Sequence, residues 1–179
     1  MKKTILLTIA TFALIQCTKK ENPFLIQNGK IGGLKKEFTL TQIDSVFAKD
    51  SIVKPITDDA FTGNINDIEI FEKGGKHLLS LSPNDQKKIS IITLHDARYK
   101  TDKNVGLSNT FKEFRAHYEV SKITRMLNNI IIEFKNQDFY ITIDVKELPS
   151  EYWFNYDAKI ETASIPDTAK IKSLQIDWL

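Results

Sequence analysis

Hydrophobic and polar residues alternate with a period of two over residues 139–145. Successive side chains of a strand point to opposite faces of a sheet, so this segment is predicted to be a strand with one buried and one wet face. The polar turn 135–138 joins it to residues 130–134, which are predicted to be its hairpin partner. Residues 174–178 are expected to form a last strand after Pro149 has ended the hairpin.

The first half of the chain shows a similar pattern. Within residues 65–71, Ile68 and Ile70 alternate with Asp67 and Glu69, and residues 77–81 follow after a turn that contains two glycines. This arrangement predicts a second hairpin. Pro83 is expected to end it, and residues 89–94 to form a further strand.

A short helix is predicted before each hairpin. In the first half Thr41 is the expected N-cap, and in the second half Thr110 and Glu113 form a capping box for a helix over residues 109–117. Apolar residues at helical spacing supply one buried face per helix. They are Ile43, Val46 and Phe47 in the first helix, and Phe111, Phe114 and Tyr118 in the second.

The order helix, hairpin, proline, strand thus occurs twice, at an offset of about seventy residues. We therefore predict an α+β protein made of two tandem units, each with a short helix and an antiparallel β-sheet. The first unit comprises residues 29–98 and the second residues 99–179. The alternative is one irregular α+β domain, because few residue identities match between the halves.

A β-branched residue followed by glycine precedes each predicted helix, as Ile31-Gly32 and as Val105-Gly106. With the duplicated element order, this resembles the β-lactamase-inhibitor-protein fold, and single copies resemble small outer-membrane lipoproteins of the SmpA/OmlA type. Both groups are binding proteins and not enzymes, so the resemblance implies a binding function. It carries over no functional residue.

The N-terminus has the three parts of a secretory signal. Two lysines precede an apolar stretch over residues 4–15, which is too short to span about 30 Å of hydrocarbon as a helix. The sequence Leu14-Ile15-Gln16-Cys17 then resembles the lipobox of bacterial lipoproteins, in which the cysteine is acylated. Gln16 stands where that motif prefers a small residue, which fits a Bacteroidota-like lipobox better than a proteobacterial one.

We therefore expect a signal peptide over residues 1–16, a palmitate-bearing Cys17, and a tether that extends to residue 28. Such a protein belongs to the cell envelope, in the first instance to the outer membrane of a Gram-negative bacterium. The alternative is an ordinary secretory signal with a chance cysteine. Cys17 is the only cysteine, so its acylation would leave no thiol for a disulfide or for catalysis.

Charge argues against a nucleic-acid partner. Without Lys2 and Lys3 the basic residues only balance the 23 acidic ones, whereas binding to nucleic acid needs a basic excess. The partners expected from the sequence are therefore the membrane, through the lipid, and an envelope or secreted protein.

Few side chains suggest chemistry. His77, His95 and His117 lack the close spacing of a metal site. His95 next to Asp96 is either an orienting pair for a base or a strand-end histidine beside a turn-forming aspartate. We predict no catalytic residue, no cofactor and no metal. The acidic and amide residues Asp58, Asp59, Asn64, Asn66 and Asp67 are interpreted as a solvated loop rather than a calcium site, because the EF-hand spacing is absent.

One long loop stands out because it is rich in aromatic residues. It covers residues 149–170, and long loops in compact domains are commonly functional or disordered. Its four rings either cover the sheet as a lid or present an anchor to a partner, with Trp153 or Tyr152 expected to be exposed. The candidate partner-binding residues are Tyr152, Trp153, Phe154 and Tyr156.

Together these observations favour a non-catalytic, membrane-anchored binding protein. It would act either as an inhibitor or immunity-type protein that neutralises a secreted enzyme, or as a scaffold in an envelope complex. The alternative is an envelope subunit that binds or hydrolyses glycans, with tyrosine and tryptophan stacking on sugars.

Overall fold

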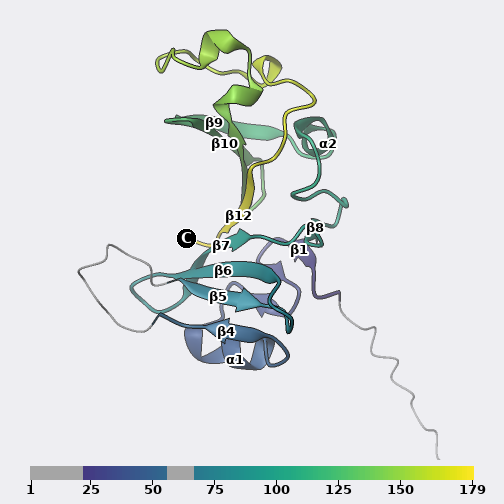
Figure 1. Ribbon diagram of the computed structural model, residues 1–179, viewed down its shortest axis with the longest axis vertical. Helices are drawn as coiled ribbons and strands as arrows, with labels where there is room; N and C mark the ends of the chain where they lie inside the picture. Colours follow the sequence, from purple (N-terminus) through teal and green to yellow (C-terminus); the bar gives the residue numbers. More distant parts are fainter. Residues whose placement is uncertain (1–21, 56–66) are drawn as a thin grey trace, which may run out of the picture.

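The computed structural model describes residues 22–55 and 67–179, and its main element is one antiparallel sheet of eight strands. The strand order is β4–β5–β6–β7–β12–β11–β10–β9, and Figure 1 shows the strands following one another in this order along the long axis. The strands are β4 (Ser51–Val53), β5 (Ile68–Phe71), β6 (His77–Pro83), β7 (Ile89–Leu94), β9 (Val120–Met126), β10 (Asn129–Phe134), β11 (Phe139–Asp144) and β12 (Ser173–Asp177).

Both predicted hairpins are confirmed, because β5 pairs with β6 and β10 pairs with β11 in antiparallel registers. The predicted strands over residues 89–94 and 174–178 are also present. The sequence did not predict β4 and β9, which are the two edge strands of the sheet. In β9 no residue is fully buried, so a clear hydrophobic alternation is missing there.

A second, smaller sheet lies at the N-terminal end of the described chain. It has the order β3–β2–β1–β8, and β1 runs parallel to β8. Its strands are β1 (Leu25–Gln27), β2 (Lys30–Ile31), β3 (Leu34–Lys35) and β8 (Lys100–Thr101). The predicted tether to residue 28 is therefore wrong at its end, because Ile26 is buried and the Phe24 carbonyl accepts a hydrogen bond from the Lys100 amide.

The glycines of Ile31-Gly32 and Val105-Gly106 are each required because another backbone segment approaches closely. A Cβ on Gly32, whose φ is +51°, would lie 2.2 Å from the carbonyl oxygen of Pro23. A Cβ on Gly106 would lie 2.2 Å from the carbonyl oxygen of Tyr99. Any larger residue at either position would force the backbone apart.

The helices are short. A 3-10 turn, η1 (Leu40–Gln42), leads into α1 (Ile43–Val46), and α2 is Phe111–Arg115. The capping box of Thr110 and Glu113 is confirmed. Thr41 is not the N-cap of the first helical segment, because Thr39 has that role and forms a capping box with Gln42. An aspartate three residues after Thr41 is too short to complete such a box, whereas glutamine reaches back to the N-cap amide.

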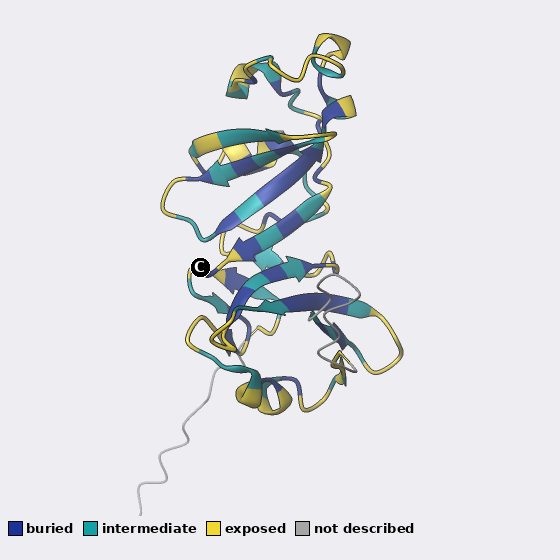
Figure 2. Ribbon diagram, turned by 90° about the vertical axis from the view of Figure 1, so that its left-hand side faces the viewer, coloured by how far each residue is buried: buried dark blue, intermediate teal, exposed yellow. Residues whose placement is uncertain are grey.

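One core serves both halves of the chain. Its central row crosses six neighbouring strands in register, and every member is at most 2% exposed. This row consists of Ile70, Leu79, Leu94, Leu174, Ile141 and Ile132. Figure 2 shows the buried segments continuing from one half of the sheet into the other. The protein is thus a mixed α+β fold in which strands predominate, with α1 near the β4 edge and α2 in the second half (Figure 1).

Within residues 22–55 and 67–179, no helix is long and apolar enough to cross a membrane.

Candidate functional site

The sheet face opposite the core carries a row of mostly polar side chains that crosses all eight strands. Strand pairing places these residues next to one another in the order Val53, Glu69, Ser80, Thr93, Gln175, Tyr140, Glu133 and Lys122. Most of them are half-buried or exposed. We call this surface the outer face.

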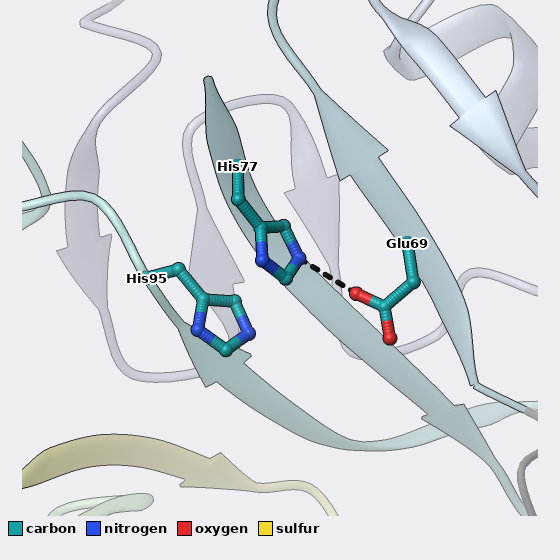
Figure 3. A group of neighbouring side chains, drawn as sticks. All are labelled: Glu69, His77 and His95. Carbon is teal, nitrogen blue, oxygen red and sulfur yellow. Dashed lines mark hydrogen bonds and ion pairs between the residues drawn. The ribbon is translucent and has the colours of Figure 1, made fainter. Parts of the chain in front are cut away.

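Two histidines join this row at the β5–β6–β7 end. Glu69 lies on β5, His77 begins β6, and His95 follows the last residue of β7. One ligand atom from each of the three residues lies within 4.8 Å of the other two. Figure 3 shows the His77 ring between His95 and the Glu69 carboxylate, with a hydrogen bond from His77 to Glu69. We call these three residues the His–Glu cluster.

Ser80 connects the members of this cluster. Its hydroxyl donates to Glu69 Oε2 over 2.6 Å and lies 2.8 Å from His95 Nε2. His77 Nε2 lies 2.6 Å from the same carboxylate oxygen. The Ser80 hydroxyl has only one proton, and it uses that proton in the hydrogen bond to Glu69. The contact between Ser80 and His95 therefore requires His95 Nε2 to be the donor and the Ser80 oxygen the acceptor.

This geometry differs from a nucleophilic triad. In a triad the imidazole accepts the hydroxyl proton and the carboxylate orients the other imidazole nitrogen. Here the Glu69 carboxylate accepts a hydrogen bond directly from the Ser80 hydroxyl. Ser80 is only 7% exposed. The arrangement therefore holds Ser80 as a hydrogen-bond donor to Glu69 and lacks the order of groups found in a Ser–His–acid triad.

The imidazole rings form a stack on the outer face. Phe71 and His77 have ring centroids 4.5 Å apart, and His77 and His95 have centroids 3.8 Å apart at an interplanar angle of 20°. Burial lowers the pKa of His95, and the neighbouring His77 lowers it further, against the smaller opposing effect of Glu69. His95 is nevertheless the exposed member of the cluster, whereas Glu69 and His77 are half-buried.

The sequence analysis did not group these three residues, because they lie on three different strand segments. Glu69 and His77 lie on opposite strands of a predicted hairpin, so that hairpin was the one available signal for their proximity. His95 joins them only because β7 pairs with β6. The expectation of no metal site rested on spacing along the chain alone.

His95 and Asp96 do not form an orienting pair, and the turn-forming interpretation of Asp96 is the correct one. The Asp96 carboxylate accepts from the Arg98 amide over 2.9 Å and from Arg98 Nε over 2.9 Å and Nη2 over 2.6 Å, and Lys76 Nζ lies 3.1 Å away. Burial raises the pKa of this carboxyl, but the hydrogen bonds from Arg98 and Lys76 outweigh burial and hold the pKa at about 2. Asp96 is thus an ionised, structural residue.

The aromatic loop begins after β11 with two 3-10 turns, η2 (Val145–Glu147) and η3 (Ser150–Tyr152), and contains a third, η4 (Thr162–Ser164). Tyr152 is half-buried and donates to Ser164 over 2.9 Å, and Trp153 is half-buried and donates to the Leu148 carbonyl over 2.8 Å.

The rings that reach solvent are Phe154, which is 83% exposed, and Tyr156, which is 58% exposed. The expectation that Trp153 or Tyr152 would be the exposed ring is therefore wrong. The polar tips of both residues find acceptors within the fold, so both rings remain partly covered.

Arg125 of β9 fixes the conformation of this loop. Its guanidinium donates to the carbonyls of Tyr152 and Trp153, and it lies 4.9 Å from the centre of the Tyr156 ring. A cation placed over a tyrosine ring in this way is attracted by its π electrons. The loop therefore holds Phe154 and Tyr156 out into solvent on an anchored backbone.

A hollow of about 580 Å³ lies beside α1 and includes Asp50 and Glu72 in its lining. Glu72 is not available as a free acid or base, because it accepts two hydrogen bonds from the Arg98 guanidinium, at 2.9 and 3.0 Å. Helix α1, beside which the hollow lies, is at the β4 end of the sheet, whereas the aromatic loop lies at the β9 end (Figure 1). The candidate calcium residues Asp58, Asp59, Asn64 and Asn66 lie outside the described residues.

The fold and its outer face define a class of protein: a mixed α+β chain built on one open antiparallel sheet. No model of a known protein family matches the chain, and no curated protein matches it either. Among solved structures it is similar to yfeY of Escherichia coli, a protein described as uncharacterized, with a TM-score of 0.50 and 12% identity. The similarity covers 87% of this chain and 99% of that chain, and it concerns the fold alone.

Proposed function

We propose that this chain is an envelope lipoprotein, anchored through an acylated Cys17 in the outer membrane of a Gram-negative bacterium, and that it acts as a non-catalytic protein-binding module. The observation that carries the binding function is the exposure of Phe154 and Tyr156 on a loop fixed by Arg125. Inhibition of a secreted enzyme and a scaffold role in an envelope complex are both versions of this function.

Exposed aromatic side chains on an ordered loop are typical of interface hot spots, because they bury a large area and lose few rotamers on binding. The anchoring by Arg125 lowers the entropy that the loop would lose on binding.

The proposal includes the tandem origin of the two halves. Its support is the strand order, in which α1 precedes the run β4–β7 and α2 precedes the run β9–β12, with β7 and β12 adjacent at the centre. The close backbone approaches at Gly32 and Gly106 occur once in each half and add to this support.

The glycan alternative has less support. Trp153, the residue best suited to stack on a sugar, is half-buried and uses its indole N–H for the Leu148 carbonyl. A glycosidase also needs two available carboxyl groups in one cleft, and Glu72 in the hollow beside α1 is held by Arg98.

Replacement of both exposed rings, as Phe154→Ala with Tyr156→Ala, should weaken binding to the partner by about 2 kcal/mol or more, which is at least about thirtyfold. The melting temperature should change by no more than a few degrees, because neither side chain lies in the core. The measurement is a pull-down from detergent-solubilised envelope with quantitative mass spectrometry, followed by titration of the partner so identified.

The matched control is Leu179→Ala, since Leu179 is 78% exposed but belongs to the chain end and not to the loop. It should leave binding unchanged. Equal recovery of the same proteins by the double variant and the control would contradict the proposed site. Capture of a polysaccharide in place of a protein would favour the glycan alternative.

Cys17→Ser should release the protein from the membrane, because serine cannot accept the thioether-linked lipid. The wild-type chain should enter the detergent phase of Triton X-114 and the variant the aqueous phase. Thr18→Ala, one position further along, should behave like the wild type. If the Cys17→Ser variant still entered the detergent phase, the lipid anchor would be absent or lie elsewhere.

A further inference from the structure

The His–Glu cluster combines two imidazoles and one carboxylate on three neighbouring strand segments (Figure 3). Two histidines with one acidic residue form a common ligand set for zinc, with one position left open for water or another ligand. Imidazole nitrogen also suits copper and nickel ions, whereas calcium and magnesium prefer oxygen ligands alone. The chemistry of the cluster therefore fits a divalent transition metal.

The charge of Glu69 has no permanently cationic partner within the described residues, where its ion-pair contact is His77. The basic side chains nearby, Arg98 and Lys76, pair with Asp96. Two imidazoles and a carboxylate thus lie together at one place on the outer face, where the negative charge of Glu69 can attract a cation.

We propose that Glu69, His77 and His95 bind one divalent transition-metal ion, with Zn²⁺ as the principal candidate, on the outer face of the sheet. This site is independent of the proposed partner-binding loop, which lies at the opposite end of the sheet (Figure 1).

Binding requires small rearrangements that the structure permits. The metal takes the place of the proton between His77 Nε2 and Glu69 Oε2, whose separation must open from 2.6 Å to about 3.4 Å, given tetrahedral geometry and metal–ligand bonds of about 2.0–2.2 Å. That proton is released to solvent.

The donor directions of two nearly parallel rings do not converge, so His95 must turn out of the stack. It is the exposed ring, and it gives up only its contact with Ser80 and the stacking on His77. Ser80 stays hydrogen-bonded to Glu69, in the supporting role that residues behind a metal ligand commonly have.

The test uses the full chain with Cys17→Ser, which removes its only thiol as a competing ligand, purified without a histidine tag. ZnCl₂ is titrated in competition with a chromophoric chelator. We expect one Zn²⁺ per chain, with binding weakened at least tenfold in His95→Ala and in Glu69→Gln. His117→Ala is the matched control, because His117 is also exposed but lies just beyond α2, away from the cluster, and it should bind like the parent.

The imidazole NMR signals give a second readout that does not depend on affinity. On addition of ZnCl₂ the signals of His77 and His95 should shift, while those of His117 stay in place. Neither main variant threatens the fold, since His95 is exposed and Glu69→Gln preserves the side-chain shape. Absence of binding, equal binding by all variants, or a shift confined to His117 would each overturn the proposal.

Discussion

Phe114→Ala should lower the free energy of unfolding by about 3–5 kcal/mol, the range typical of phenylalanine truncation in a core. Phe114 is fully buried and packs α2 onto the sheet. Its ring lies 5.9 Å from that of Phe134 and 6.3 Å from that of Phe139. Alanine leaves a cavity between helix and strands that neighbouring rings can fill only in part, so the lost contacts are not regained.

Thermal and urea unfolding of the full chain measure this effect. A loss of that size should lower the melting temperature by roughly 10 °C, since 1 kcal/mol corresponds to about 2–4 °C for a chain of this length. Lys112→Ala in the same helix is the control, because Lys112 is exposed and should change stability by no more than about 0.5 kcal/mol. If Phe114→Ala cost as little as the control, α2 would not be part of the core.

Asp96→Asn should lower the free energy of unfolding by about 2–3 kcal/mol, less than Phe114→Ala. The Asp96 carboxylate is buried at the end of β7 and holds Arg98 and Lys76, and Arg98 in turn holds Glu72 after β5. Asparagine keeps the shape but loses the charge and one of the acceptor oxygens. The estimate lies below the full cost of a broken buried ion pair because Arg98 and Lys76 are partly exposed and water screens their charge.

Urea unfolding of Asp96→Asn against Asp85→Asn provides the measurement. Asp85 is an exposed aspartate in the turn between β6 and β7, so the same change there should be nearly neutral. Equal stability of the two variants would mean that the Arg98–Asp96 contacts contribute little to the fold. Arg98→Lys offers a further check, because lysine keeps the charge but cannot donate from two nitrogens at fixed geometry.

Local patterns predicted the parts of the fold that depend on neighbours in the chain. The two-residue period of β11, the turns after β5 and β10, and the capping box of Thr110 with Glu113 are all decided within a few residues. The N-cap was predicted at Thr41, whereas the structure places it two residues earlier, at Thr39. The edge strands β4 and β9 escaped prediction because an edge strand buries little.

The candidate sites could not be predicted from local sequence patterns. Glu69, His77 and His95 become neighbours only through the pairing of β5 with β6 and of β6 with β7. In the aromatic loop the sequence located the four rings but not which of them reach solvent. Arg125, distant in sequence, positions the backbone there and leaves Phe154 and Tyr156 uncovered.

By itself, the sequence determined the alternation that makes strands, the caps of α2 and the candidate lipid-attachment signal, because each depends on residues close together in the chain. Only the tertiary structure decided that β7 pairs with β12 to give one sheet and one core, and that residues 25–27 form a strand. It also decided that three dispersed polar residues form a cluster. The physical reason is that the burial of a side chain and its neighbours depend on which distant segment packs against it. The spacing of residues along the chain does not specify that segment.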